Sequence, residues 1–249
     1  MSNGKRDSGT PSGSPSMDAG AGDAGSAVDA GRGASRAGTV VKRTLQLTFD
    51  DGPEPVKSAL NPILKEVEAR GVIAAFFVLG EEVKTSRSAI VTIRDAGHVV
   101  GNHSWDHMEK GTSTYSDDQI YLEFEDTHAE VKKAGVTMDY WRAPRGEQIQ
   151  RIQQILRSPK PPQKQLYSNG HCDWQADSKD AIGSSTAEAM LKSIERDFKD
   201  PKIPPLRLKG TRVWRLLFHV KDSTAKALTN VLNELQAQGG TFVDFSQDS

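Results

Sequence analysis

From residue 41 onward, short apolar runs alternate with amphipathic helical stretches, and this alternation restricts the possible folds more than any other feature of the sequence. The expected strands are residues 43–50, 73–79, 98–102, 138–143, 166–176, 213–220 and 241–245. The expected helices are residues 55–70, which Gly71 ends, and residues 116–134, 186–198 and 223–238, which carry apolar side chains at helical spacing. Repeated strand–helix units predict an α/β fold with a parallel sheet, either open or closed into a barrel. Both architectures place functional residues at the carboxyl ends of the strands.

The first 40 residues differ in composition from the remainder of the chain. They hold 9 of the 22 glycines and no aromatic residue. Such a segment buries too little apolar surface to offset the entropy lost on ordering. We therefore expect a disordered, flexible tail over residues 1–40 and one folded domain over residues 41–249. The tail lacks the apolar stretch of an export signal, and it fits either a plain extension or a spacer behind a removed signal or lipid anchor.

Charge and cysteine content exclude several classes of protein. The 32 basic and 33 acidic side chains give a net charge of −1, so a general attraction to nucleic acid is not expected. No apolar run reaches the length of about 18 residues that a transmembrane helix requires. Cys172 is the single cysteine, which excludes an intrachain disulfide and a multi-cysteine zinc site. A location outside the cytoplasm stays open, since a large core needs no disulfides.

Side chains able to bind a metal follow the first and third expected strands. Asp50 and Asp51 end the first strand, where one carboxylate can hold a metal and the other can move a proton, although such a pair can also cap the next helix. His103 and His107 are spaced i, i+4, so one helical turn would bring both imidazoles to the same side. With Asp51 as the third ligand, they predict a site of two histidines and one carboxylate with open positions.

Further polar side chains follow the later strands. Arg142 can fix the orientation of a carboxylate. Pro144 and Gly146 shape a loop whose backbone N–H groups can face a substrate oxygen. Asp177 lies at the tip of the fifth strand, and His219, after an apolar strand, is a candidate general acid.

The other histidines have no predicted chemistry. His98 lies inside a strand and is expected to be structural. His128 lies on the apolar stripe of a helix and is expected to pack. His171 has no assigned task.

Five short motifs carry a family resemblance. They are TFDDGP at 48–53, HSWDH at 103–107, RAPRG at 142–146, DSKDA at 177–181 and LFH at 217–219. In this order they resemble the motifs of the NodB-homology polysaccharide deacetylases, also called carbohydrate esterase family four. The resemblance spans residues 43–245.

The resemblance implies a distorted seven-stranded (β/α) barrel that removes N-acetyl groups from amino sugars with a divalent metal. By motif position, Asp51, His103 and His107 would be the metal ligands, Asp50 the catalytic base and His219 the catalytic acid. Zn²⁺ is the first choice for this ligand set, with Co²⁺, Ni²⁺, Mn²⁺ or Fe²⁺ as alternatives.

The remaining motif positions imply supporting roles. Arg142 would orient the base, and Asp177 would pair with the catalytic histidine. The backbone N–H of Arg145 would help to bind the oxyanion, and Leu217 would line the pocket for the acetyl methyl group.

The sequence departs from the family pattern at two positions. Arg145 stands where the family often has Tyr, and a guanidinium there could favour an anionic glycan such as peptidoglycan with its lactyl-linked peptide. Ala181 stands where the pattern has Trp, which removes an aromatic wall that Trp105 or Trp141 could replace.

The expected activity is the release of acetate from an acetylated glycan: peptidoglycan, a chitin-like polymer or an exopolysaccharide. A small-molecule amidohydrolase and a catalytically silent carbohydrate-binding relative are the alternatives. Retention of both the base and the acid argues against the silent relative. We expect a monomer in the cell envelope, periplasmic or secreted, with a cytoplasmic location as the alternative.

Overall fold

The structure is a computed structural model that describes residues 41–53, 59–167, 170–182 and 186–246. The expected tail, residues 1–40, lies outside the described residues, as does most of the first turn of the helix expected at 55–70. The part of the chain that the structure describes from residue 41 is an α/β domain with a seven-stranded sheet. No helix in these ranges is long and apolar enough to cross a membrane.

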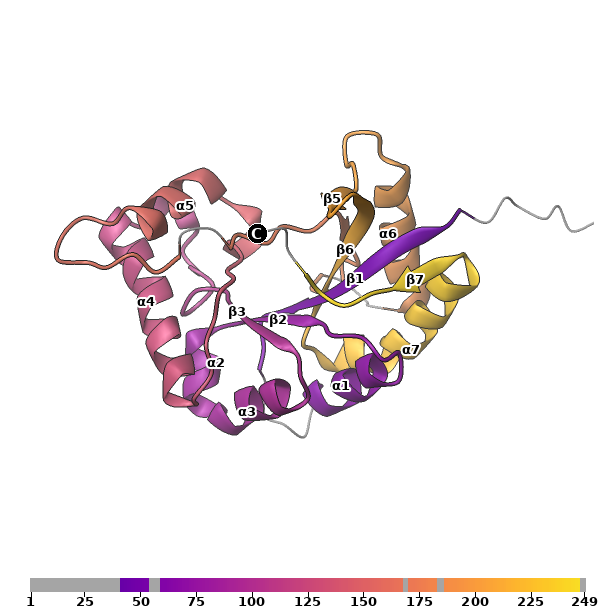
Figure 1. The fold of residues 1–249 in the computed structure, drawn as a ribbon, viewed down its shortest axis with the longest axis horizontal. Helices are drawn as coiled ribbons and strands as arrows, with labels where there is room; N and C mark the ends of the chain where they lie inside the picture. Colours follow the sequence, from indigo (N-terminus) through magenta and orange to yellow (C-terminus); the bar gives the residue numbers. More distant parts are fainter. Residues whose placement is uncertain (1–40, 54–58, 168–169, 183–185, 247–249) are drawn as a thin grey trace, which may run out of the picture. The chain divides into compact units, whose positions relative to one another are not determined.

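The strands are short and most are separated by helices (Figure 1). The strands are β1 (Arg43–Asp50), β2 (Ala75–Val78), β3 (Val99–Asn102), β4 (Ala176–Asp177), β5 (Leu206–Leu208), β6 (Thr211–His219) and β7 (Gly240–Phe242). The α-helices are α1 (Leu60–Glu68), α2 (Gly80–Thr85), α3 (Arg87–Asp95), α4 (Asp117–Lys133), α5 (Ile149–Arg157), α6 (Ala187–Lys199) and α7 (Asp222–Ala237). Short 3₁₀ turns lie at Thr112–Thr114 and Pro144–Gly146.

The sheet brings the carboxyl ends of its central strands together. Its order is β3-β2-β1-β6-β4 with parallel neighbours, and β7 also pairs in parallel with β1. In this register Asp50 lies beside Phe77 of β2 and His219 of β6. The first aspartate motif and the last histidine motif are therefore adjacent, although they lie far apart in the sequence.

Backbone hydrogen bonds continue the pairing beyond the regular strands and close a ring. Trp141 bridges Asn102 at the end of β3 on one side and His171 on the other. A few residues further along, Gln175 N–H donates to the Arg215 carbonyl (3.0 Å), and β4 pairs with β6. This ring of narrow bridges and regular ladders agrees with the distorted barrel that the family resemblance implies.

Two expected strands are much shorter than predicted. Residues 138–143 form a single bridge at Trp141, because Pro144 has no amide hydrogen and begins a 3₁₀ turn directly afterwards. Residues 166–176 contribute the bridge at His171 and the first residue of β4. Strand β5, which was not among the expected strands, pairs antiparallel with β6.

Alternation along β1 separates two environments. Leu45, Leu47 and Phe49 belong to the main hydrophobic core, which α1, α7 and α6 help to enclose. Gln46, Thr48 and Asp50 are also buried, and alternation turns them to the other face, the barrel interior. The strand therefore carries apolar residues toward the helices and a buried polar row that ends at the site.

The helices expected from periodicity are confirmed with shifted boundaries. Helix α4 begins after Ser116, whose hydroxyl accepts from Gln119 N–H while the Gln119 side chain accepts from Ser116 N–H. Helix α6 begins after Thr186, whose side chain accepts from Ala189 N–H. Outside the sheet, α6 contacts α7, and α7 contacts α1, so consecutive helices cover the apolar face of the strands (Figure 1).

Phe49 should be the most sensitive position of this core. Its ring is fully buried and stacks between Phe76 (5.0 Å) and Phe218 (5.7 Å) of the flanking strands. We expect Phe49→Ala to lower the free energy of unfolding by about 3–5 kcal/mol. Leu122→Ala, at a side chain that is 47% exposed, is the matched control and should change it by less than about 0.5 kcal/mol. Urea denaturation measures both, and equal effects would contradict the packing described here.

Candidate active site

The adjacent aspartates occupy different environments because β1 ends between them. Asp50 is the last residue of the strand and is 2% exposed inside the barrel. Asp51 is the first residue after it and adopts a left-handed conformation (φ 70°), which is rare for a residue with a Cβ atom. Its carboxylate is partly exposed, whereas burial raises the pKa of Asp50 against the lowering effect of the Arg142 guanidinium.

The histidine motif lies in a loop after β3 and not in the helical turn that its spacing suggested. Ser104 and His107 are both left-handed (φ 72° and 63°), so the loop turns sharply between the two histidines. Glu123 of α4 holds the loop by accepting from the N–H groups of Trp105 (2.9 Å) and Asp106 (3.2 Å). The sharp turn still brings the two imidazole rings to within 5.1 Å between centroids.

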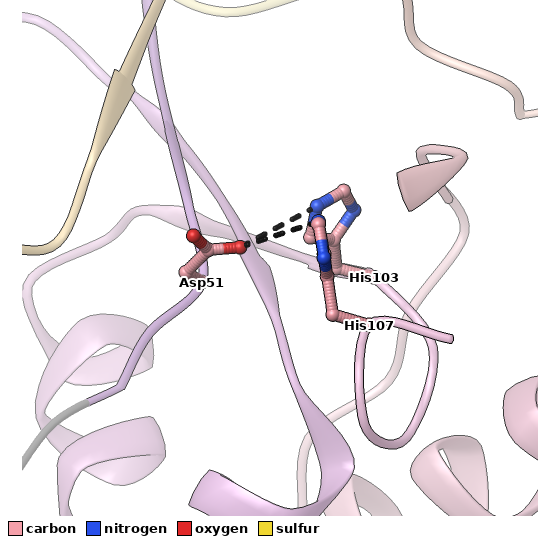
Figure 2. Close-up of side chains that lie close together, drawn as sticks. All are labelled: Asp51, His103 and His107. Atoms are coloured by element: carbon pink, nitrogen blue, oxygen red, sulfur yellow. Dashed lines mark ion pairs between the residues drawn. The ribbon is translucent and has the colours of Figure 1, made fainter. Parts of the chain in front are cut away.

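Asp51, His103 and His107 converge on one point (Figure 2). Asp51 Oδ1 lies 3.7 Å from His103 Nε2 and 3.8 Å from His107 Nε2. Asp51 Oδ1 is buried and has no hydrogen-bond partner among the described residues. A buried carboxylate oxygen without a hydrogen bond, facing two imidazole nitrogens, fits a divalent cation that prefers nitrogen and oxygen ligands.

His103 has the protonation state that a metal ligand needs. Its Nδ1 lies 3.0 Å from the Arg142 carbonyl oxygen, which can only accept, so Nδ1 carries the proton and Nε2 presents a lone pair. Burial lowers the pKa of His103 to about 3, despite the opposing charge of Asp51. The ring is therefore neutral at ordinary pH.

His107 is also neutral, and its contact with Arg145 must change if it binds a metal through Nε2. Burial lowers its pKa, and the charge of Arg145 adds to this effect. Arg145 Nη1 lies 3.0 Å from His107 Nδ1, and a guanidinium can only donate. The imidazole proton is therefore on Nε2 here, and coordination at Nε2 requires it to move to Nδ1 and the Arg145 side chain to turn away.

Arg142 is bound to Asp50 inside the barrel. Its Nη1 donates to Asp50 Oδ1 (2.6 Å) and to Thr48 Oγ1 (2.9 Å), and its Nε donates to the Cys172 carbonyl (2.7 Å). The side chain is fully buried, and its guanidinium lies 4.1 Å from the centre of the Phe77 ring. These contacts fix the orientation of the Asp50 carboxylate.

The partner of His219 is Asp180 and not Asp177, which corrects the sequence prediction. His219 Nδ1 lies 2.7 Å from Asp180 Oδ1, and His219 N–H donates to Asp180 Oδ2 (2.7 Å). Asp177 instead accepts from Lys179 N–H (2.7 Å) and forms an ion pair with its ammonium group (2.7 Å). Asp180 is the second aspartate of DSKDA. Because the loop turns between the two aspartates, Asp180 contacts His219 while Asp177 contacts Lys179.

Asp180 sets the charge of His219. Burial alone would lower the pKa of His219, but the hydrogen bond and charge of Asp180, with the charges of Asp50 and Asp51, raise it. Of the three histidines around the site, His219 is therefore the one kept protonated most readily.

These side chains line a pocket of about 250 Å³. Its lining comprises Asp50, Asp51, His103, His107, Arg145, Trp174, Asp177, Lys179, Ala181, Ile182, Leu217 and His219. Leu217 is thus where the sequence placed it, in the wall beside the ionisable groups. Arg145 is left-handed (φ 56°) at the wall, with its guanidinium also bound to the Met108 carbonyl (2.8 Å).

The aromatic wall comes from a tryptophan that the sequence analysis did not select. Trp174 lines the pocket beside Ala181. Trp141 is 1% exposed and packs on Phe124, and Trp105 lies against Gly80 at the start of α2. Neither Trp105 nor Trp141 lines the pocket, so the suggested replacements are wrong.

The other histidines lie away from the pocket. His98 precedes β3, and its Nδ1 accepts from Ala74 N–H (3.3 Å). His128 Nδ1 contacts the Tyr167 hydroxyl (3.2 Å), and the His171 ring packs on Trp141 (4.6 Å). Sequence reasoning also missed Glu123, for which the sequence offers no local signal, since an acidic residue on an amphipathic helix usually faces solvent.

The His219 pairing can be measured through its pKa. We expect Asp180→Asn to lower the pKa of His219, because a neutral amide stabilises the imidazolium less than a carboxylate does. Asp177→Asn is the matched control and should leave the His219 titration, followed by NMR of the ring Hε1 signal, almost unchanged. The opposite pattern would restore the pairing expected from the sequence.

The free energy of unfolding should depend on pH through the titration of His219. The folded pKa of His219 is raised, so its stabilising contribution is complete below the unfolded pKa of about 6.5 and is lost as the pH rises through the folded pKa. The stability lost in Asp180→Asn should therefore be larger at pH 6 than at pH 9.

Comparisons with known proteins point to the same family as the motifs. The family model for polysaccharide deacetylase matches residues 37–159. The chain is 29% identical over 210 residues to peptidoglycan-N-acetylmuramic acid deacetylase PdaA of Bacillus subtilis, covering 82% of this chain and 71% of PdaA. It is 26% identical over 207 residues to peptidoglycan-N-acetylglucosamine deacetylase PgdA of Listeria monocytogenes, covering 82% of this chain but 38% of PgdA.

A solved structure agrees at the level of the fold. The wild-type BA3943 protein of Bacillus anthracis, described as a CE4 family pseudoenzyme, matches with a TM-score of 0.63 and 23% identity. The match covers 83% of this chain and 65% of that one. With the ordered motifs, the parallel sheet and the converging Asp-His-His group, these matches show that the chain belongs to the NodB-homology polysaccharide deacetylases, carbohydrate esterase family four.

Proposed function

We propose that this chain is a metal-dependent hydrolase that removes N-acetyl groups from a peptidoglycan-type glycan and releases acetate. One observation carries the proposal: the buried Oδ1 of Asp51 has no hydrogen-bond partner among the described residues and faces the Nε2 atoms of His103 and His107. These three residues would hold the cation, for which Zn²⁺ is the first choice. When bound, it supplies a Lewis acid for the acetamide oxygen and for water.

The chain's own residues supply the proton transfers. Asp50, oriented by Arg142, would take the proton of the attacking water at its carboxylate. The backbone N–H of Arg145 would stabilise the oxyanion, and Leu217 would pack against the acetyl methyl group. His219 would give a proton to the departing amine, because Asp180 keeps its imidazole charged. The products are acetate and a free amino sugar.

The relatives support peptidoglycan as the substrate class. PdaA and PgdA are both named for deacetylation of peptidoglycan sugars, and both match 82% of this chain. Peptidoglycan lies outside the cytoplasm, so this substrate implies a cell-envelope or secreted location. We infer that the protein acts there as a monomer.

Acetate release tests the proposed function directly. The protein is incubated with peptidoglycan and with acetylated chitooligosaccharides, after treatment with chelator and again after addition of Zn²⁺. We expect acetate only in the Zn²⁺-loaded samples. Equal release with chelator would overturn the metal dependence, and binding of glycan without release under any metal would favour the catalytically silent carbohydrate-binding relative.

The two adjacent aspartates should separate in their effects. Asp51→Asn keeps the size of the side chain but removes its charge from the ligand set, so Zn²⁺ affinity should fall sharply. Asp50→Asn leaves the three ligands in place and should keep about one metal per chain, while turnover falls by roughly 100-fold or more. Metal content measured beside acetate release decides between them. Metal lost from Asp50→Asn and retained in Asp51→Asn would reverse the two roles.

Arg145 should influence the choice of substrate once a metal occupies the site. Coordination of His107 through Nε2 removes the acceptor that Arg145 uses at Nδ1, and the guanidinium can then turn to an anionic glycan. We expect Arg145→Tyr to lower kcat/KM for peptidoglycan several-fold more than for a neutral chitooligosaccharide, because the variant loses one hydrogen bond between charged groups. Equal losses on the two substrates would assign Arg145 to the loop alone.

A further inference from the structure

The pocket wall holds a cation that has no role in the proposed mechanism. Lys179 lines the pocket, and its side chain is 46% exposed. It stands between the two aspartates of DSKDA, and the structure gives each of these aspartates a different partner. Asp180 holds His219, and Asp177 holds Lys179. The motif therefore positions two cationic groups from one short segment.

Lys179 is held at the pocket by its own loop. Its backbone is left-handed (φ 60°), its N–H donates to Asp177 Oδ1, and its ammonium pairs with Asp177 Oδ2 at 2.7 Å. The Asp177 N–H is fixed in turn by Asp197 of α6 (2.9 Å), and Ser178 N–H donates to the Leu217 carbonyl (3.1 Å). The loop that carries Lys179 is thus attached to β6 two residues before His219.

Stability does not explain this arrangement. An ion pair with a half-exposed lysine contributes little to folding, and the left-handed residue costs conformational energy. A lysine ammonium has three donors, and Asp177 is the one carboxylate within ion-pair distance of it among the described residues. The remaining donors can reach a ligand in the pocket.

Arg145, the other cationic side chain of the pocket wall, already has several contacts. The Arg145 guanidinium contacts His107 Nδ1, the Met108 carbonyl and, at 3.4 Å, Glu147 Oε1. Lys179 needs no such rearrangement before it can bind an anion. It is therefore the cation best prepared to meet a negatively charged substrate.

We propose that Lys179 is a specificity-determining residue that binds a carboxylate of the glycan substrate, with Asp177 as its positioning residue. This inference rests on the proposed function, since it names the chemical class of substrate for the same pocket. The substrate class is an amino-sugar chain that carries carboxylates, as peptidoglycan does through its lactyl-linked peptides. A neutral N-acetylglucosamine polymer offers no carboxylate to the ammonium group.

Binding and turnover of two fragments test the proposal. Calorimetry measures the affinity of the full chain for a disaccharide–peptide fragment of peptidoglycan, which is anionic, and for N-acetylchitotetraose, which is neutral. Acetate release is measured on the same fragments. The variants are Lys179→Met, which keeps the length of the side chain, and Lys226→Met at an exposed position of α7 as the matched control.

We expect Lys179→Met to weaken binding of the anionic fragment about 10-fold more than binding of the neutral one. The lost preference should appear in Kd and KM more than in kcat, and added NaCl should weaken anionic binding more in the wild type than in the variant. Lys226→Met should keep the wild-type preference. Melting temperatures of all three proteins should agree within about 2 °C, since an ion pair with a half-exposed lysine contributes little stability.

The outcomes separate this inference from the proposed function. Equal weakening of both fragments, an unchanged preference in Lys179→Met, or no binding of the anionic fragment by the wild type would overturn the role of Lys179. A wild type that releases acetate while Lys179→Met keeps its preference would overturn this inference alone. A wild type that shows the Lys179-dependent preference but never releases acetate would overturn the proposed function and leave the carboxylate site standing.

Discussion

The buried ion pair between Arg142 and Asp50 is the interaction on which both the barrel and the site depend. Arg142 follows Trp141, where strand pairing is reduced to isolated bridges. Its side chain joins this segment to β1 and to the Cys172 carbonyl. These side-chain contacts link the Trp141 segment to the opposite side of the barrel, where a single bridge provides few backbone hydrogen bonds. Removal of one partner of such a pair typically costs about 3–5 kcal/mol, because the other charge is left buried. Fold and chemistry therefore share one contact.

Around this fixed centre, the functional side chains lie on loops with left-handed residues. Asp51, Ser104, His107 and Arg145 all have positive φ values although none is glycine. Residues in such conformations cost energy and persist only where their surroundings hold them. Glu123, Asn102 and the carbonyl of Val78 supply those restraints around the histidine loop. The regular strands set the distances between motifs, and these loops set the directions of the side chains.

This division explains what the sequence could predict. The strand–helix alternation depends on periodicity, which is local, and β1 was predicted with its observed boundaries. The partner of His219 depends on the turn between Asp177 and Asp180, and a motif does not specify which carboxylate points inward. The bridges at Trp141 and His171 depend on neighbours distant in the sequence, so apolar runs overestimated both strands.

The three imidazoles of the pocket show how small differences in partner chemistry divide the work of one site. His103 is buried and the His219 side chain is 12% exposed, and each has its Nδ1 fixed by an oxygen at hydrogen-bond distance. The oxygen beside His103 is a neutral carbonyl, so burial dominates and its pKa falls to about 3. The oxygen beside His219 belongs to a carboxylate, which outweighs burial and raises the pKa. A ring suited to donate a lone pair and a ring suited to donate a proton can therefore share one pocket, because the partner behind each ring decides whether the effect of burial is outweighed.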